Sequence, residues 1–85
     1  MKKFEFTVKE RLGIHARLAG MLTKEAKKYS STITVTKDDK EVNTLKLMAL
    51  MGLGVKCGDT VTVTIEGADE DTCAPIIEAF FNENF

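Results

Sequence analysis

The sequence predicts a two-layer α+β domain in which a four-stranded antiparallel sheet is covered on one face by three helices. Three segments alternate apolar and polar residues, as half-buried strands do, and three others have the apolar spacing or content of helices. The predicted order is strand, helix, strand, strand, helix, strand, helix. No repeat, low-complexity tract or linker divides the 85 residues, which indicates one domain over residues 1–85.

The strands are predicted from residues that alternate between two faces. The positions expected to face the core are Phe4, Phe6, Val8, Ile33, Val35, Val61, Val63 and Ile65. Threonine fills the alternate positions over 32–36 and 60–64, so the other face of the sheet is expected to lie in water. Asp38 and Asp39 are typical of a hairpin turn and precede a short strand over Glu41–Asn43.

The helices are predicted from apolar residues at helical spacing. The stripe of the first helix, over Ala16–Lys28, is formed by Ala19, Leu22, Ala26 and Tyr29. The segment Leu47–Leu53 is short and apolar nearly all round, and Gly54 is well placed to end it. The last helix runs to the C-terminus, with Cys73, Ile77 and Phe80 in phase.

Pro75 leaves two possible starts for the last helix. If Asp69 is the N-cap, Pro75 lies beyond the first turn and removes a backbone hydrogen bond. If Thr72 is the N-cap, Pro75 lies inside the first turn, where its missing N–H costs nothing. The sequence favours a start near Thr72 or a distorted first turn.

The composition argues against several classes of protein. Twelve basic and thirteen acidic residues give a net charge of -1, which provides no electrostatic footprint for general nucleic-acid binding. Phe4 and Phe6 are expected in the core, so they are not placed to stack on bases. No segment is long and apolar enough to span a membrane, and the N-terminal alternation is not that of a signal peptide. We therefore expect a cytoplasmic protein that binds no nucleic acid and does not insert into membranes.

The sequence offers no metal site. Cys57 and Cys73 are isolated and lack metal-ligand spacing, and the only histidine, His15, has no metal-ligand residues near it. The simplest interpretation of the cysteines is two reduced, partly buried thiols, with a disulfide or redox role as the alternative. A glycine-rich nucleotide loop is also absent, so we expect neither metal nor cofactor.

The chemistry is expected at the segment Gly13-Ile14-His15-Ala16-Arg17, which joins the first strand to the first helix. His15 therefore falls at or next to the helix N-cap, where unpaired amides with partial positive charge bind anions such as phosphate. The same field opposes a positive charge on His15, and a neutral imidazole has a lone pair that can attack phosphorus. Arg17 offers a planar fork of donors for phosphoryl oxygens. The alternative is that His15 only caps the helix and Arg17 is solvated.

Nothing near this segment supplies a base, a metal or a substrate pocket. These residues are better suited to a protein that carries a group between partners than to one that catalyses a complete reaction alone. Whether such a protein counts as an enzyme stays open, because it would be an intermediate in phosphotransfer rather than a stand-alone catalyst.

The motif Gly13-Ile14-His15-Ala16-Arg17 resembles the active-site motif of the HPr family, the histidine-containing phosphocarriers of the bacterial phosphoenolpyruvate–sugar phosphotransferase system. Three further segments match that family in order and spacing: Val42-Asn43, the run Leu47–Val55, and Glu66–Glu70. The resemblance covers nearly the whole chain. It implies an open-faced β-sandwich, which agrees with the predicted elements, and a monomer.

The resemblance also implies a mechanism. His15 would be phosphorylated on Nδ1 by Enzyme I, which draws on phosphoenolpyruvate, and the phosphoryl group would pass to the IIA domain of a sugar permease. Arg17 matches the residue that contacts the phosphoryl group. The helix N-terminus formed by Ala16, Arg17 and Leu18 would bind its oxygens.

A docking surface is implied by the same resemblance. Leu47, Met48 and Met51 match the hydrophobic patch that binds both partners, and flexible methionines suit a surface that fits more than one partner. The alternative is that the whole short helix is core, which we expect for Leu50 and Leu53. Three lysines flank this surface and would steer acidic partners, unless they are merely solvated: Lys24, Lys27 and Lys46.

Two positions depart from the family. Leu18 stands where proline is usual, and Lys46 stands where many Gram-positive members carry a regulatory serine. We expect phosphotransfer to survive Leu18, because its N–H adds a donor to the anion site at some loss of rigidity. Lys46 has no hydroxyl, and the offset of Thr44 argues against a substitute. The two departures leave one alternative function, a regulatory adaptor of the HPr fold that carries little sugar flux.

Overall fold

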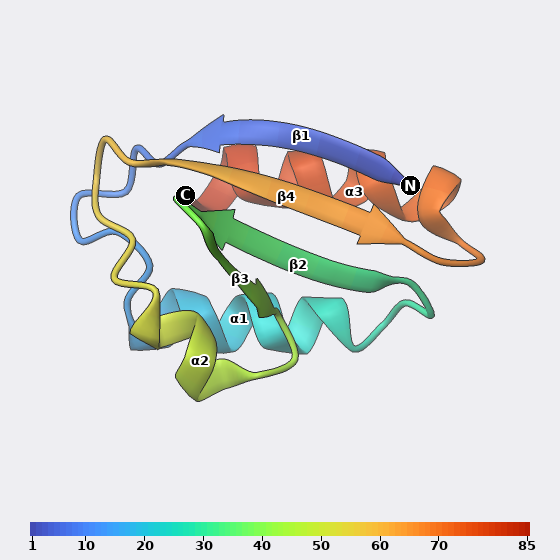
Figure 1. Cartoon of the computed structure of the whole chain (residues 1–85), viewed down its shortest axis with the longest axis horizontal. Coiled ribbons are helices and arrows are strands. Elements are labelled where there is room, and N and C mark those ends of the chain that lie inside the picture. The colour runs from blue at the N-terminus through green and yellow to red at the C-terminus, as the bar shows by residue number, and fades with distance from the viewer.

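The computed structural model describes residues 1–85 and shows a four-stranded antiparallel sheet with helices on one face (Figure 1). The elements are β1 (Lys2–Thr7), α1 (Ala16–Ala26), β2 (Thr32–Lys37), β3 (Lys40–Asn43), α2 (Leu47–Gly52), β4 (Thr60–Glu66) and α3 (Glu70–Asn84). The strand order is β1-β4-β2-β3. α3 packs against β1 and β4, and α2 packs against α1 and β3. The predicted α+β fold class and element order are confirmed.

The strand register places the predicted apolar residues on one face. Phe4 lies opposite Val63, and Val63 lies opposite Val35 on its other side. The residues between them face away from the helices and are mostly threonine, as the alternation predicts. Lys37 of β2 pairs with Lys40 of β3, so Asp38 and Asp39 are the two residues of the turn between these strands.

The centre of the core is Phe81 of α3, whose side chain is completely buried. Its ring contacts those of Phe4, Phe6 and Phe85 at centroid distances of 5.8, 5.5 and 4.8 Å. The predicted inward position of Phe80 is wrong, because Phe80 is only half-buried. The inward stripe keeps a strict spacing of four residues, from Cys73 through Ile77 to Phe81, toward β1 and β4.

α3 begins at Glu70, so the favoured start near Thr72 is also wrong. The Thr72 and Cys73 amides both donate to the Asp69 carbonyl, at 3.2 and 2.9 Å, a shared acceptor that is common at the start of a helix. Pro75 therefore lies inside the helix and removes one hydrogen bond, at the exposed side of the first turns. α1 also ends earlier than predicted, at Ala26.

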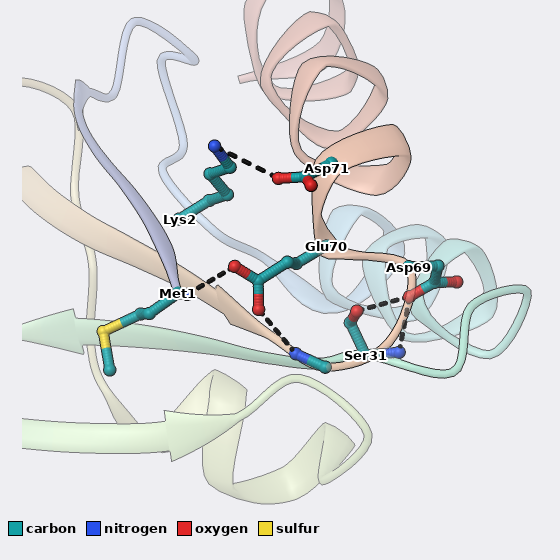
Figure 2. Close-up of polar contacts among 7 residues, drawn as sticks. Met1, Lys2, Ser31, Asp69, Glu70 and Asp71 are labelled. Carbon is teal, nitrogen blue, oxygen red and sulfur yellow. Dashed lines mark hydrogen bonds and ion pairs between the residues drawn. The ribbon is translucent and has the colours of Figure 1, made fainter.

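The early start of α3 is explained by the side chain of Asp69 (Figure 2). Its carboxylate accepts hydrogen bonds from the N–H of Ser31 at 2.9 Å and from the Ser31 hydroxyl. It also accepts the backbone N–H of Ser30 at 3.0 Å. Asp69 thus satisfies the loop before β2 rather than capping its own helix. This contact fixes the start of α3 against the loop between α1 and β2.

Glu70 and Asp71 hold the start of β1 to the same corner (Figure 2). The Glu70 carboxylate accepts from the Gly67 amide at 3.1 Å and pairs with the amino group of Met1, while Lys2 pairs with Asp71 at 3.1 Å. This corner lies at the end of β1 opposite to the end that leads to His15. It is therefore structural and separate from the candidate site.

We expect the corner to make the protein sensitive to acid. The Ser31 side chain and the Ser30 amide hold the pKa of Asp69 below its usual value, and the terminal amino group and Gly67 amide do the same for the pKa of Glu70. A carboxyl whose pKa is lowered by folding stabilises the native state above its unfolded pKa, and this contribution is lost as the pH falls through the folded pKa. The urea midpoint should therefore fall steeply below about pH 4.

Asp69→Asn tests this expectation. The variant should be less stable than the parent at pH 7, and the difference should shrink as the pH falls below the usual pKa of aspartate, because the contribution of the Asp69 carboxylate is then lost progressively. Asp71→Asn, a change of the same kind at a largely exposed ion pair, should alter stability little at any pH. Parallel pH profiles for the parent and Asp69→Asn would contradict the assignment.

Candidate functional site

His15 is the N-cap residue of α1, as the sequence predicts. Its backbone is extended, with φ -97° and ψ 176°, and its carbonyl accepts the first helical hydrogen bond from Ala19 at 2.8 Å. The imidazole makes no capping hydrogen bond and is half-buried at the surface. The alternative that the ring serves only as a helix cap therefore finds no support in the geometry.

The first turn of α1 presents unpaired donors beside this ring. The amides of Ala16, Arg17 and Leu18 have no acceptor in the structure, and the turn contains no acidic side chain. Unpaired amides carry the positive end of the helix dipole. The arrangement can hold an anion next to the imidazole.

Arg17 is exposed and available to such an anion. Its guanidinium makes one weak contact, 3.8 Å from Nη1 to the sulfur of Met21 on the next turn, and pairs with no carboxylate. A free guanidinium beside unpaired amides gives a concentrated set of donors for phosphoryl oxygens.

The loop before His15 is held by the chain itself. Gly13 has φ +68°, and a Cβ there would lie 2.1 Å from the Val55 carbonyl oxygen and 2.7 Å from Lys56 Cα. The next residue, Ile14, is buried and donates its N–H to that Val55 oxygen at 3.1 Å. Glycine at this position is required by a close approach of backbone to backbone, which sequence reasoning could not locate.

The supporting loop is anchored in turn. The Asp59 carboxylate accepts the Lys56 amide at 2.8 Å and pairs with Lys37 of β2 at 3.1 Å. These contacts hold the pKa of Asp59 below its usual value. The position of His15 thus depends on β2 and on the loop before β4 as well as on α1.

α2 exposes an apolar surface next to α1. Leu47, Met48 and Met51 are 37%, 78% and 36% exposed, whereas Leu50 and Leu53 are buried, as predicted. The alternative that the whole helix is core is wrong. The three flanking lysines are exposed and form no ion pair: Lys24, Lys27 and Lys46.

Further exposed residues lie near the site at positions that no sequence pattern marks. Arg11 and Leu12 occupy the turn closed by the Gly13 amide on the Glu10 carbonyl at 2.9 Å, and both are exposed, Leu12 by 70%. Leu45, just before α2, is 49% exposed. No periodic pattern marks these positions, because the strand alternation ends at Val8.

Comparisons with known proteins agree with this geometry. The family model described as the PTS HPr component phosphorylation site matches residues 2–83. This chain belongs to the HPr family. The phosphocarrier protein HPr of Mycoplasma genitalium is 38% identical over 85 residues, which cover 99% of this chain and 97% of that protein.

Two solved structures extend the comparison. HPr of Thermoanaerobacter tengcongensis superposes with a TM-score of 0.89 at 36% identity, covering 96% of this chain and 92% of that one. Crh of Bacillus subtilis, whose structure is a swapped dimer, superposes at 0.77 with 32% identity, covering 100% and 98%. The open-faced β-sandwich implied by the resemblance is therefore confirmed, and relatives of this chain include dimers.

Leu18, which departs from the usual proline of HPr proteins, lies in the core. Only 2% of its surface is exposed, and its amide belongs to the unpaired donors of the first turn. Leucine thus adds buried apolar surface to the inner side of α1 while keeping an N–H that proline lacks.

Thr44, the hydroxyl nearest to Lys46, is buried. Its Oγ1 donates to the Ile33 carbonyl at 2.8 Å, and its own carbonyl accepts from the Thr23 hydroxyl at 2.7 Å. A buried hydroxyl is not accessible to a kinase unless the hydrogen bonds around it break and the segment unfolds locally. The geometry agrees with the expectation that Thr44 does not replace the serine of other HPr proteins.

The two thiols differ in environment. Cys57 is exposed, so the expectation of a partly buried thiol is wrong there, and Cys73 is buried in the core, where burial raises the pKa of its thiol.

No helix has the length and apolar character needed to cross a membrane.

Proposed function

We propose that this HPr-family chain is a cytoplasmic phosphocarrier that accepts a phosphoryl group on His15 from Enzyme I and passes it to the IIA domain of a sugar permease. The observation that carries the proposal is the imidazole of His15 beside three unpaired amides and a free Arg17 guanidinium. The match of the family model for the phosphorylation site supports it.

The transfer needs no group beyond these residues and the two partners. The lone pair on His15 Nδ1 attacks phosphorus, and the bond from phosphorus to the donor breaks as the new N–P bond forms. Arg17 and the amides of Ala16, Arg17 and Leu18 stabilise the charge on the three phosphoryl oxygens. The reverse sequence, with IIA as acceptor, returns His15 to its starting state.

Docking is assigned to the α2 patch, defined as Leu47, Met48 and Met51. Exposed apolar side chains on a helix that packs against α1 place a hydrophobic contact beside the His15 loop. The lysines Lys24, Lys27 and Lys46 would speed encounter with acidic partners. We expect the chain to act as a monomer, because each partner must reach the same surface.

Intact mass after incubation with Enzyme I, magnesium and phosphoenolpyruvate tests the proposal. The protein should gain one acid-labile phosphoryl group, His15→Ala should gain none, and Arg17→Ala should be phosphorylated about 100-fold more slowly. A phosphoryl group that persists in His15→Ala would place the chemistry elsewhere.

One observation favours a second candidate, a regulatory adaptor. The chain resembles Crh of Bacillus subtilis along its full length, and Leu18 and Lys46 depart from the usual carrier residues. An adaptor would bind partners through the α2 patch without accepting phosphate. The absence of phosphorylation by an Enzyme I that phosphorylates a standard HPr would move this candidate to first place.

A further inference from the structure

The structure contains one cavity, an open groove of about 380 Å³ between the C-terminal end of α1 and the outer side of α3. We call it the α1–α3 groove. It is lined by Glu25, Pro75, Ile76, Ala79, Phe80 and Glu83. None of these residues belongs to the site of His15 or to the α2 patch.

The floor of the groove is apolar and exposed. Ile76 is 47% exposed, and Phe80 is only half-buried although it borders the core. Both side chains point away from the inward stripe of α3, which is already filled by Ile77 and Phe81. An exposed isoleucine beside a phenylalanine ring, as Ile76 and Phe80 form here, is typical of a surface that binds an apolar side chain of a partner.

The rim of the groove is acidic. Two carboxylates line it, Glu25 and Glu83, and α3 carries no lysine or arginine. Glu83 lies in the last turn, where the helix dipole adds partial negative charge, and it forms no ion pair. Glu25, on the facing helix, is already held by Lys28 at 3.0 Å and Tyr29 at 2.7 Å, so Glu83 is the carboxylate left for a partner.

The groove is remote from the phosphotransfer surface. Glu25 lies ten residues beyond His15 on α1, which corresponds to about 15 Å along the helix axis. α2 packs against α1 and contributes no residue to the groove. A protein bound in the groove would leave His15 and the α2 patch free.

We propose that the α1–α3 groove is a second docking surface, and that it binds a basic amphipathic helix of another protein. The apolar face of such a helix packs on Ile76 and Phe80, and its lysine or arginine side chains pair with Glu83. The acidic rim selects against an acidic partner, which the α2 side of the molecule with its free lysines attracts. The inference goes beyond the proposed function, because it requires no phosphate on His15.

A titration followed by ¹H–¹⁵N correlation spectra tests the inference. The probe is a synthetic peptide of leucine and lysine, about fourteen residues long, with its leucines on one helical stripe. We expect shift changes at residues 75–83 and at Glu25, and equal affinity for the parent and His15→Ala. A peptide of the same composition with strictly alternating residues should bind at least tenfold more weakly.

Matched variants decide whether the groove is responsible. Glu83→Lys should weaken binding of the helical peptide at least tenfold, whereas Glu78→Lys, the same charge change on the same helix outside the groove, should change it less than twofold. Ile76→Ser should weaken binding at least fivefold. Equal losses for Glu83→Lys and Glu78→Lys would show nonspecific attraction to acidic charge and would overturn the proposal.

Two other outcomes would also overturn it. Shift changes centred on α2 rather than on residues 75–83 would place the peptide on the α2 patch. Self-association of the free protein that Ile76→Ser abolishes, measured by sedimentation, would show that the groove receives a second copy of this chain instead.

Discussion

Gly13→Ala should reduce phosphorylation of His15 about 100-fold, although the substituted side chain never touches the phosphoryl group. The new Cβ would lie 2.1 Å from the Val55 carbonyl oxygen, and φ +68° is itself unfavourable for alanine. The loop must move, which breaks the Ile14–Val55 hydrogen bond and shifts His15 from the amides of α1. We also expect the free energy of unfolding to fall by about 2 kcal/mol.

Gly20→Ala is the matched control for this prediction. Gly20 lies in α1, and a Cβ there meets nothing within 4 Å, so the substitution should raise helix stability by up to about 1 kcal/mol. The initial rate of phosphorylation by Enzyme I and the urea midpoint should be measured for both variants. A Gly13→Ala protein that is phosphorylated at the parent's rate would show that the loop is not what positions His15.

Phe81→Ala should have the largest effect on stability. The side chain is completely buried and contacts three other phenyl rings, so its removal leaves a large cavity between α3 and the sheet. Truncation of a buried phenylalanine costs about 3–5 kcal/mol, which approaches the whole stability expected of an 85-residue domain. The variant should be largely unfolded at 37 °C.

Phe80→Ala is the matched control, because it removes a phenyl ring from the same helix but not from the centre of the core. Phe80 is half-buried, and its nearest ring partner, Phe85, lies 6.2 Å away, so its truncation should cost about 1–2 kcal/mol. Urea denaturation of both variants gives the comparison. Equal losses would mean that the core is not centred on Phe81.

The sheet was predictable from the sequence because alternation has a period of two and leaves no other assignment for Phe6 or Val63. The phase of α3 was not, since Phe80 and Phe81 differ by one position on a helix that is apolar on more than one side. The start of α3 was missed because Asp69 forms its hydrogen bonds with Ser30 and Ser31, 38 residues or more away in the chain. Contacts of this kind have no local signal.

The candidate site divides in the same way. The location of His15 at a helix N-terminus follows from the local sequence, because Gly13 and His15 directly precede the apolar stripe of the first helix. The support from Val55 and Lys56 depends on tertiary packing, and nothing around Gly13 indicates which segment approaches it. The exposure of Leu47 and Met48 was inferable only because a short apolar helix in a small domain cannot bury every face.

The strand order β1-β4-β2-β3 has a consequence for how the protein is made. β1 pairs with β4 alone, and β4 also joins β1 to β2, with Lys2 opposite Ile65. During synthesis β1 therefore cannot pair with β4, its only neighbour in the sheet, until nearly four-fifths of the chain has been translated. A nascent chain that lacks β4 can form only the β2–β3 hairpin of this sheet, so the sheet is completed late in synthesis.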